Sequence, residues 1–568
     1  MLKMIKSSFS SRSKFFIFSI SILLTISCLP QKHKLGLLGE KAMVVSAHPL
    51  ASEVGKDILL QGGNAVDAAI AVHMALAVVY PQAGNLGGGG FMVIREKYGE
   101  VHSLDYREKA PLAASRDMYL DAEGNPQPEI SQNGHLAAGV PGSVDGMVKA
   151  HEKFGSLPWS ALINPAIVLA EDGFNLTEVE ANFLSSYSGN LKKYSTIDPL
   201  HYTGKAFKAG DKLVQKELAN TLKLIRDHGR EGFYAGEVAD HLVTEMRRGG
   251  GLISHEDLEK YQSIWRKPLT GNYKDYRIIT MGPPSGGGII LLQMLGILEN
   301  HKISKNKFSD YLHLKTEMER RIYADRAEYM ADADFYPVPV EQLVADEYLK
   351  ERFQNFNPDK ATPSAEIKAG DLLQESEETT HFSIVDQEGN AVSSTTTLNG
   401  NMGSKVLVAG AGFILNNEMD DFSIKPGFPN MFGVLGGEAN KVEPEKRMLS
   451  SMSPTILEKN GKLFMVVGTP GGSTIPTSVF QAIVNVIEFD MGMQESVNEN
   501  RFHSQWKPDW ISYEKGDSNE PILKELRAKG HELKERNAIG KVDAILVRED
   551  GTLEAGADYR GMDSAAGF

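Results

Sequence analysis

The chain has 568 residues, of which 41% are hydrophobic and 24% are charged. This composition is typical of a globular protein that is long enough to bury large cores. The formal net charge of −14 argues against binding to nucleic acid or to an anionic membrane surface, because both require basic patches. No Pro- or Ser-rich linker and no block of charge divides the chain, so we expect one compact body of one or two lobes.

The first 27 residues have the pattern of a signal peptide. Four basic residues precede an apolar core at 15–26, and this core is shorter than the about 20 residues that span a bilayer. Cys28, the only cysteine, follows and resembles the lipidated N-terminal cysteine of bacterial lipoproteins. We therefore expect an exported protein, periplasmic or at the cell surface, with a lipid anchor at Cys28. The alternative is simple cleavage after a small residue such as Ser27.

The next segment alternates short strands with helices. Asn64 is placed to cap an Ala-rich helix that Pro81 stops. The glycine run 87–90 leads into a strand and lacks the Gly-Lys-Ser/Thr of a phosphate-binding loop, so we reject that interpretation. The elements expected here are strands at 43–47, 91–94 and 101–106 and helices at 51–61 and 65–79.

The middle of the chain, from about 143 to 356, is predicted to be mostly helical, and strands dominate after Thr379. Strand pairs bracketed by helices fit two sheets packed face to face with helices outside, although periodicity alone predicts only a mixed α and β protein. The expected helices are 143–154, 159–171, 213–228, 236–248, 307–331 and 474–489, with hairpins at Asn460-Gly461 and 549–551.

The segment around Thr379 predicts a hairpin that brings two threonines together. Strands at 381–385 and 391–397 are rich in β-branched and aromatic residues and flank a turn. If the hairpin is symmetric about Glu388, Thr397 lies opposite Thr379, with Cβ atoms about 4.5–5.5 Å apart. Taken alone, this pattern more often belongs to a Thr-rich sheet edge without chemistry.

A threonine hydroxyl becomes a good nucleophile only when a base stands beside it, and an N-terminal threonine can use its own α-amine. That amine exists only if the chain is cut between Glu378 and Thr379.

Linked motifs along the chain resemble those of the γ-glutamyltranspeptidases, in the order and with the spacing of that family. The match runs from about Ala42 to Phe568 and leaves only the N-terminal segment outside it. The motifs that resemble the family's large subunit are 85–92, 105–111 and 139–143, and those that resemble its small subunit are Thr379-Thr380-His381-Phe382, Leu398-Asn399, 415–422, 449–455 and 468–473.

The resemblance implies an α+β fold, the four-layer αββα sandwich of the N-terminal-nucleophile hydrolases. It implies a precursor that cuts itself into a large subunit, 28–378, and a small catalytic subunit, 379–568, which form one globular unit. Thr379 is then expected to attack the γ-amide of glutathione or another γ-glutamyl compound. Water, an amino acid or a dipeptide would take the γ-glutamyl group, which makes the protein a γ-glutamyltransferase and glutathione hydrolase.

A pair of glycines follows the apolar strand expected at 463–468. Two backbone N–H groups that point at one spot form an oxyanion hole, and the loss of one such donor costs about 10²–10³ in rate. An isolated glycine pair is usually an ordinary turn, but the resemblance places Gly471 and Gly472 against the tetrahedral intermediate on Thr379.

A γ-glutamyl group ends in an α-ammonium and an α-carboxylate. The ammonium requires acidic side chains in the binding site, and the carboxylate requires a guanidinium together with hydroxyls. Taken alone, Arg107 would usually form a surface ion pair, and Ser450-Ser451 would usually form a turn. Only their joint fit to one zwitterionic group favours a substrate-binding role. The family positions expected to bind the ammonium are Asp421, Glu418 and Asn399, and those expected to bind the carboxylate are Arg107, Ser450 and Ser451.

His381, beside the nucleophile, suggests a Ser-His-Asp type of triad, but the freed α-amine, with a reference pKa of about 7.7–8.0, serves as the base without it. His531-Glu532 lacks the second histidine of a zinc motif, and Asp332–Asp334 lacks the rest of a calcium loop, so we expect no metal or organic cofactor. The segment 426–437 resembles the loop that covers the site in the family, with Phe432 at its aromatic position.

Two other functions fit parts of this pattern. A related amidohydrolase acting on glutaryl or cephalosporin side chains would need no ammonium site, and Asp421 and Arg107 argue against it. A surface lipoprotein that binds without catalysis would not need Thr379 and Thr397.

Overall fold

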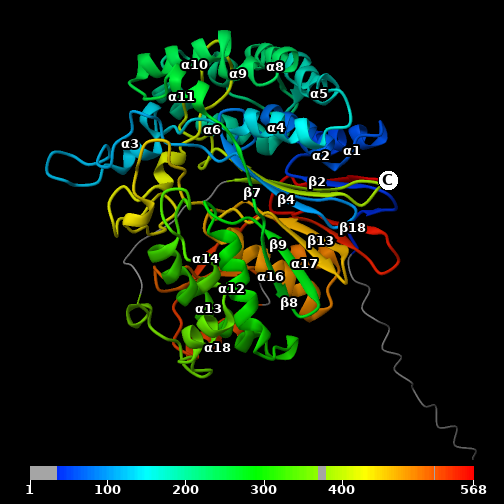
Figure 1. Cartoon of the computed structure of the whole chain (residues 1–568), viewed down its shortest axis with the longest axis vertical. Coiled ribbons are helices and arrows are strands. Elements are labelled where there is room, and N and C mark those ends of the chain that lie inside the picture. The colour runs from blue at the N-terminus through cyan, green and yellow to red at the C-terminus, as the bar shows by residue number, and fades with distance from the viewer. Residues whose placement is uncertain (1–34, 369–378, 517–518) are drawn as a thin grey trace, which may run out of the picture. The chain divides into compact units, whose positions relative to one another are not determined.

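The computed structural model describes residues 35–368, 379–516 and 519–568. Within them, two seven-stranded sheets stack face to face, and a layer of helices covers the outer side of each sheet (Figure 1). This four-layer αββα arrangement confirms the expected fold class. The expectations for the signal segment, for Cys28 and for Glu378 concern residues outside those described.

The first sheet contains the hairpin that follows Thr379. Thr380 pairs with Thr396 and Val385 with Ala391, which confirms the symmetric register, and one further step sets Thr379 against Thr397. All neighbouring strands are antiparallel. Their order is β19 (Ser564–Gly567), β2 (Met43–Ser46), β10 (Thr380–Val385), β11 (Ala391–Thr397), β3 (Gly89–Arg95), β4 (Val101–Asp105) and β7 (Ile264–Arg266).

The second sheet is also antiparallel throughout. It contains the hairpins expected at Asn460-Gly461 and at 549–551, which are β12–β13 and β17–β18. In both sheets, strands from before and after residue 379 lie side by side. The order is β1 (Leu38–Gly39), β18 (Leu553–Gly556), β17 (Asp543–Val547), β13 (Lys462–Gly468), β12 (Thr455–Lys459), β9 (Tyr276–Thr280) and β8 (Leu269–Tyr273).

The space between the two sheets is filled by apolar side chains. Met43 and Val45 of β2 point into it, together with Val93, Val466 and Ile545 of facing strands. Because side chains alternate along a strand, the neighbour of these two residues, Val44, packs on the helix side instead. The central strands β10 and β11 are therefore buried on both faces, although β11 is rich in Ser and Thr.

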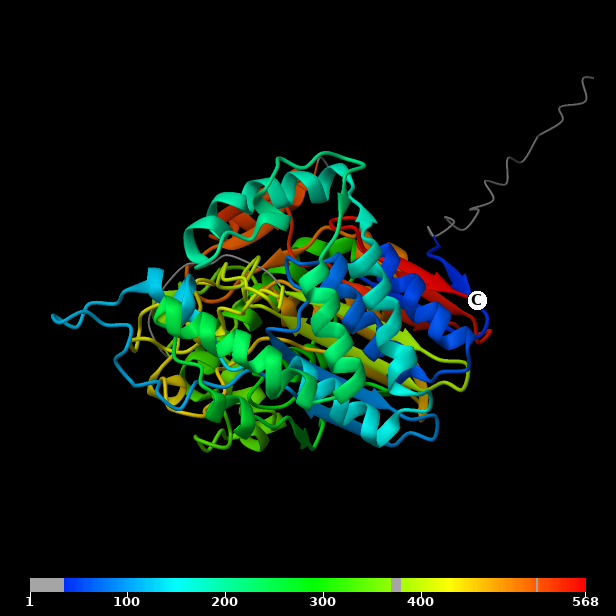
Figure 2. The same cartoon turned by 90° about the horizontal axis from the view of Figure 1, so that it is seen from above.

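The helices on the side of the first sheet pack around α2, whose fifteen residues are all buried. Asn64 and Asp67 form a reciprocal capping box at its start, as the sequence predicted for Asn64. The long helices of this layer, α2 among them, lie at the top of Figure 1 and face the viewer in Figure 2, and together they cover the outer side of the first sheet. They are α1 (Pro49–Leu60), α2 (Ala65–Val79), α4 (Ser143–Phe154), α5 (Trp159–Asp172), α6 (Glu178–Tyr194), α8 (Lys216–His228) and α10 (Gly236–Gly249).

The opposite layer covers the second sheet with its own apolar core. Its helices are α12 (Gly287–Glu299), α13 (Phe308–Tyr329), α15 (Asp346–Phe353), α16 (Thr474–Phe489), α17 (Met493–Asn498) and α18 (Glu520–Ala528). A small three-stranded sheet lies beside this layer, made of β14 (Phe502–His503), β15 (Ile511–Glu514) and β16 (Leu533–Arg536). The remaining short elements are α3 (Pro128–Gln132), α7 (Leu200–Thr203), α9 (Glu231–Tyr234), α11 (His255–Lys260), α14 (Val340–Leu343), β5 (Phe174–Asn175), β6 (Lys212–Leu213) and the single 3-10 turns 135–137, 305–307, 364–366, 418–421 and 438–440.

The middle of the chain is less uniformly helical than its periodicity predicted. Three strands, β7, β8 and β9, interrupt it and join the two large sheets. The turn between β8 and β9 places Lys274 at φ 52°, a conformation that a helical pattern does not indicate. The partner of β9 is β12, far along the chain, so local sequence carries little information about this pairing.

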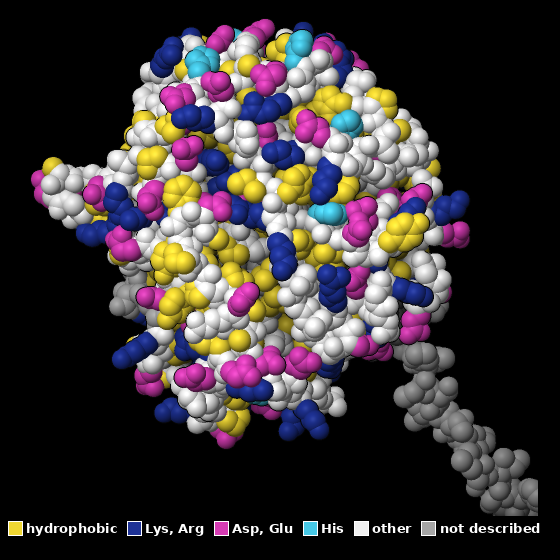
Figure 3. All heavy atoms as spheres, in the orientation of Figure 1, with side chains coloured by type: hydrophobic (Ala, Val, Ile, Leu, Met, Phe, Trp, Pro, Cys, Tyr) yellow, Lys and Arg dark blue, Asp and Glu magenta, His cyan; other side chains and the backbone are white. Residues whose placement is uncertain are grey.

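Among the described helices, none combines the length and the apolar character that a bilayer-spanning helix needs. On the face seen in Figure 3, lysine and arginine side chains are interspersed with acidic ones. This mixed surface agrees with the net negative charge of the chain.

Candidate active site

A small cavity lies at the N-terminal end of β10, where the two central strands of the first sheet leave it. Its volume is about 20 Å³, which is room for roughly one water molecule. Eight of the ten residues expected to act on or bind the substrate line this cavity; Glu418 lies behind Arg107, and Gly471 precedes Gly472. The lining residues are Arg107, Arg326, Thr379, Thr397, Asn399, Asp421, Asn430, Phe432, Val434, Ser450, Ser451, Met452, Gly472, Ser473 and Ile475.

Thr379 directly precedes β10 and is 4% exposed. Thr397 is the last residue of β11, and its hydroxyl accepts a hydrogen bond from the backbone N–H of Asn399 at 2.7 Å. Asn85 donates its side-chain amide to the Thr397 carbonyl at 2.9 Å. These bonds fix the end of β11 and give the Thr397 hydroxyl a defined position.

The imidazole of His381 is engaged by hydrogen bonds within the first sheet. Its Nδ1 lies 2.9 Å from the hydroxyl of Thr395, and its Nε2 lies 3.1 Å from that of Ser383. Complete burial lowers the pKa of His381 to about 3. The imidazole is therefore neutral, and both nitrogens are engaged by hydroxyls within the sheet.

Gly471 and Gly472 connect β13 to α16 in backbone conformations that favour glycine. Their φ angles are 133° and 54°, and a Cβ on Gly472 would come within 2.8 Å of the Phe432 ring. The N-terminus of a helix carries partial positive charge, because its first N–H groups have no partner within the helix. The two glycine amides thus lie next to a helix start that favours negative charge in the cavity.

The opposite end of the cavity holds a buried cluster of charges around Arg107, which follows β4. Arg107 Nη1 lies 2.8 Å from the Glu418 carboxylate, and Nη2 donates to Asp421 at 2.5 Å. The carboxylate of Glu108 is 3.8 Å from the same guanidinium. The Arg107 and Glu108 side chains are at most 1% exposed, as is that of Glu418, so water does not screen these charges.

The pKa values in this cluster follow from burial and from the imbalance of its charges. Burial raises the pKa of Glu108 to about 8 and the pKa values of Glu418 and Asp421 above their usual range. Burial by itself lowers the pKa of Arg107, but the neighbouring carboxylates outweigh it and the net pKa is raised. Three carboxyl groups share one guanidinium, so the cluster favours an additional positive charge.

Two further polar residues that no sequence motif indicated line the cavity. Arg326 of α13 donates to the Ser451 hydroxyl at 3.2 Å, and Asn430 donates to Asp421 at 2.9 Å. Arg326 sits inside a long helical pattern, far from its partner in the chain, so no local motif marks it. Asn430 lies in the segment 426–437, which was noted only for its aromatic position.

The segment 426–437 forms one wall of the cavity. The side chain of Asn430 accepts hydrogen bonds from the N–H groups of Phe432 and Val434, both at 3.0 Å. Phe432 packs against Gly472 and is 4% exposed. Hydrogen bonds therefore hold the centre of this loop in place, and the Phe432 ring lies against Gly472.

One buried group outside the cavity has residue types that bind metals: His313, Glu317 and His531. The two imidazoles are hydrogen-bonded to each other at 2.7 Å, while Glu317 is paired with Arg320 and Arg321 at 2.9 and 2.8 Å. Because two guanidinium groups neutralise the only acid, we interpret this group as an ion-pair network. An exposed group, Glu96, Glu100 and His102, is the other such cluster among the described residues.

Comparisons with known proteins agree with this geometry. The sequence profile of the gamma-glutamyltranspeptidase family matches residues 51–568. A glutathione hydrolase proenzyme of Escherichia coli K12 is 46% identical over 535 residues, which are 93% of this chain and 92% of that protein.

Solved structures share the fold. The gamma-glutamyltranspeptidase of Helicobacter pylori is 45% identical, with a TM-score of 0.56 over 60% of this chain and 96% of that one. A cephalosporin acylase from Bacillus halodurans superposes with a TM-score of 0.84 at 27% identity, over 94% of this chain and 97% of that one. The fold is therefore that of the N-terminal-nucleophile hydrolases, and the chain belongs to the γ-glutamyltranspeptidase family.

Proposed function

We propose that this chain is the precursor of a glutathione hydrolase and γ-glutamyltransferase that cuts itself between Glu378 and Thr379. Its relatives are proenzymes named glutathione hydrolase, and Thr379 lies just before β10 in the lining of a small cavity. Residues 28–378 become the large subunit and 379–568 the small subunit. Both sheets contain strands of the two pieces, paired with each other where the pieces meet, so the pieces stay together after the cut.

In the cutting step, Thr379 Oγ attacks the carbonyl carbon of Glu378. The peptide C–N bond breaks, the nitrogen takes the hydroxyl proton, and an ester between Glu378 and Thr379 remains. Water hydrolyses this ester, which leaves a carboxylate on Glu378 and a free α-amine on Thr379. The amine is the base that the nucleophile otherwise lacks.

In the catalytic cycle, the α-amine takes the proton of Thr379 Oγ as this oxygen attacks the γ-carbonyl of the donor. The N–H groups of Gly471 and Gly472 stabilise the oxyanion, and the departing amine receives the proton. Water then releases glutamate from the γ-glutamyl ester, or an amino acid or dipeptide takes the γ-glutamyl group. The Thr397 hydroxyl, opposite Thr379 in the hairpin register, orients the amine.

The observation that carries the choice of substrate is the buried charge cluster. The α-carboxylate of the donor pairs with Arg107 and with Ser450 and Ser451, and its α-ammonium pairs with Asp421, Glu418 and Asn399. Arg107 pairs with Glu418 and Asp421 in the structure, so the opposite charges that a zwitterion needs lie side by side. The surplus of carboxyl groups favours a donor that brings an ammonium.

The main competing function is that of an acylase, because a cephalosporin acylase has the same fold over nearly the whole chain. Glutaryl and cephalosporin side chains carry a carboxylate but no α-ammonium. The buried Asp421 and Glu418 would then face an uncharged part of the substrate, which is unfavourable for buried acids. The charge cluster therefore favours the γ-glutamyl substrate.

One paired measurement tests this proposal. The purified protein should give two polypeptides by intact mass, one of which begins at Thr379, and should release aniline from a γ-glutamyl anilide. A glutaryl anilide, which lacks only the ammonium, should be cleaved very slowly. Comparable rates on the two anilides would identify an acylase, and a single uncut, inactive chain would identify a binding protein.

We also propose that the protein is exported and anchored by a lipid on Cys28. The basic start, the apolar core at 15–26 and the position of the only cysteine support this. Labelling of cells with a fatty acid should mark the wild type and not Cys28→Ser, while activity survives because Cys28 precedes the catalytic body. Equal labelling of both proteins would contradict the attachment point.

A further inference from the structure

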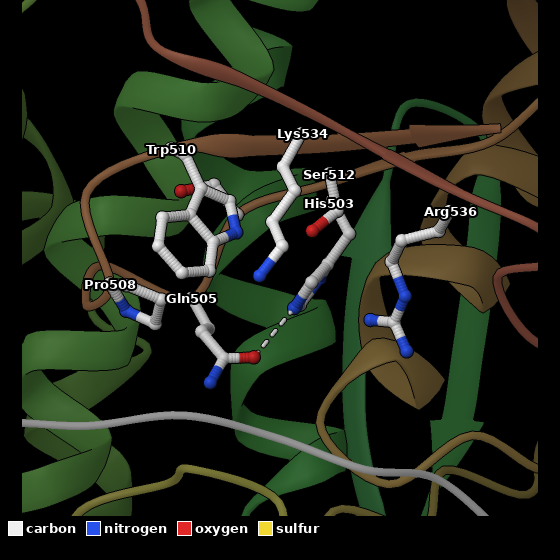
Figure 4. Close-up of a pocket in the computed structure, with 8 residues that line it drawn as sticks. His503, Gln505, Pro508, Trp510, Ser512, Lys534 and Arg536 are labelled. Carbon is white, nitrogen blue, oxygen red and sulfur yellow. Dashed lines mark hydrogen bonds between the residues drawn. The ribbon is translucent and has the colours of Figure 1, made fainter.

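A second cavity, of about 170 Å³, is shown in Figure 4. It is bounded by the small sheet β14–β16 and by the segment that joins β14 to β15. Trp510 and Gln505 come from that segment, His503 from β14, and Lys534 and Arg536 from β16. The proposed mechanism gives this cavity no role.

Gln505 forms the wall between the two cavities. Ser473, which lines the active-site cavity, donates its hydroxyl to Gln505 Oε1 at 2.7 Å. The side-chain amide of Gln505 donates to the Phe432 carbonyl at 3.3 Å. Both partners of Gln505 thus belong to the wall of the active-site cavity, so this one side chain joins the linings of the two cavities.

The chemistry of the second cavity differs from that of the first. Lys534 and Arg536 are two residues apart on β16 and pair in parallel register with Ser512 and Glu514 of β15. Side chains two apart on a strand share a face, so the two cations are presented together, whereas Glu535 points to the other face. The second cavity is therefore basic, although the chain as a whole carries a net charge of −14.

An aromatic ring completes the cationic side of the cavity. Lys534 Nζ lies 4.2 Å from the centre of the Trp510 ring, within the range of a cation–π contact. In Figure 4 the Lys534 side chain runs beside Trp510 and its ammonium points toward His503 and Gln505. A cation held in this way beside an apolar ring suits a small organic group that ends in a carboxylate.

We propose that the second cavity binds the C-terminal carboxylate of the peptide part of the substrate. This part is the dipeptide that leaves when glutathione is the donor, and the dipeptide that enters when a peptide is the acceptor. The inference rests on the proposed function, because it assigns the γ-glutamyl end to the first cavity. The enzyme then recognises a peptide donor at both ends: a zwitterion at Arg107 and Asp421, and a single carboxylate at Lys534 and Arg536.

Three donor substrates allow recognition of the γ-glutamyl end to be measured separately from recognition of the C-terminal carboxylate. Glutathione carries the C-terminal carboxylate, its C-terminal amide lacks only that charge, and a γ-glutamyl anilide has no peptide part. The wild type should prefer glutathione to its amide by about three- to tenfold in kcat/KM, the size expected for a partly exposed charge pair. The preference should appear mainly in KM.

Lys534→Ala should remove most of this preference and leave hydrolysis of the anilide within about twofold of wild type. Lys534→Glu should reverse the preference, so that the amide becomes the better donor. Glu535→Ala, on the same strand but on its other face, and Lys524→Ala, which removes an exposed lysine of α18, are the matched controls and should behave as the wild type.

The outcomes are distinguishable. Equal wild-type rates on glutathione and its amide, or losses in Lys534→Ala that are the same for all three donors, would overturn the carboxylate site while leaving the γ-glutamyl activity established. Failure of the wild type to cleave the anilide would overturn the proposed function and, with it, this inference. A loss confined to glutathione, and absent in both controls, would support the site.

Discussion

The two ends of the active-site cavity are built in different ways. The nucleophile end consists of hydroxyls and backbone amides, from Thr379, Thr397 and Gly472, and carries no formal charge before the chain is cut. The opposite end is a buried ionic cluster in which Arg107 reaches Asp421, 314 residues away in the chain. The first end arises from one hairpin and one turn, whereas the second exists only in the complete fold.

This difference between the two ends suggests that one acts on the scissile bond and the other selects the substrate. In the proposed mechanism, groups at the nucleophile end act on the bond that every donor shares, so their loss should affect all donors alike. Groups at the charged end are proposed to meet only the α-ammonium and α-carboxylate, so their loss should depend on whether the donor carries these charges. The predictions below test this division, beginning with the largest expected effect.

Replacing the nucleophile should abolish both cutting and turnover. In Thr379→Ala no hydroxyl is available to attack the Glu378 carbonyl, so the protein should stay one chain under denaturing conditions. It should also lack activity on every donor, because the same hydroxyl forms the γ-glutamyl ester. If Thr379→Ala is cut as the wild type is, the nucleophile lies elsewhere.

Replacing the acid of the charged end should affect donors selectively. Asp421→Ala removes one of the buried acidic partners of Arg107 and a contact to the ammonium, a loss of about 2–5 kcal/mol, or tens- to thousands-fold in rate. Activity on the γ-glutamyl anilide should fall by this factor, while the slow cleavage of the glutaryl anilide changes little. Equal losses on both anilides would mean that the two ends do not act separately.

Arg107→Lys is the companion test at the same end. It retains the positive charge but cannot form the two-pronged contact of a guanidinium with a carboxylate. Both anilides carry that carboxylate, so both should be impaired, by roughly tenfold or more. Wild-type rates in Arg107→Lys would show that a point charge is sufficient there.

A smaller effect, shared by all donors, is expected at the other threonine. Thr397→Ala removes the hydroxyl opposite Thr379, and loss of one such hydrogen bond costs about 1–3 kcal/mol, or about five- to more than a hundredfold in rate. Thr397→Ser keeps the hydroxyl and should lose much less. Unchanged turnover in Thr397→Ala, in a folded and fully cut protein, would remove Thr397 from the mechanism.

The smallest effect concerns stability and pH. Burial raises the pKa of Glu108 to about 8 from its ordinary value of 4.5, so the folded protein keeps a proton that the unfolded chain releases. Stability from this group is complete below pH 4.5 and is lost as pH rises through about 8. Glu108→Gln keeps a neutral group at every pH, so its melting temperature relative to wild type should rise between pH 5 and 8, by on the order of 2 °C. A constant difference across this range would show that Glu108 does not hold that proton.

Much of the hairpin and of the helix layers was predictable from sequence, because their signals are local. The β10–β11 register follows from the turn at 386–390 and from two runs of β-branched residues, and the helix 143–154 begins and ends as its period predicts. The two-sheet arrangement needed the resemblance as well as the pattern, since alternating apolar runs do not say which strands become neighbours.

What could not be predicted depends on contacts between distant segments. Strands β8 and β9 lie in a region of helical period, and their place in the second sheet is fixed by pairing with β12. Arg326 looks like any other arginine of an amphipathic helix until the fold brings Ser451 to it. The raised pKa of Glu108 likewise follows from burial next to Arg107, a property of packing that composition does not reveal.

The pairing of strands from before residue 379 with strands from after it has a thermodynamic consequence. Once the chain is cut as proposed, the ladders β2–β10, β3–β11 and β9–β12 join two separate molecules. The two pieces cannot part without dismantling both sheets, so dissociation and global unfolding become a single equilibrium. The melting temperature of the cut protein should then rise with protein concentration by mass action, whereas that of uncut Thr379→Ala should not.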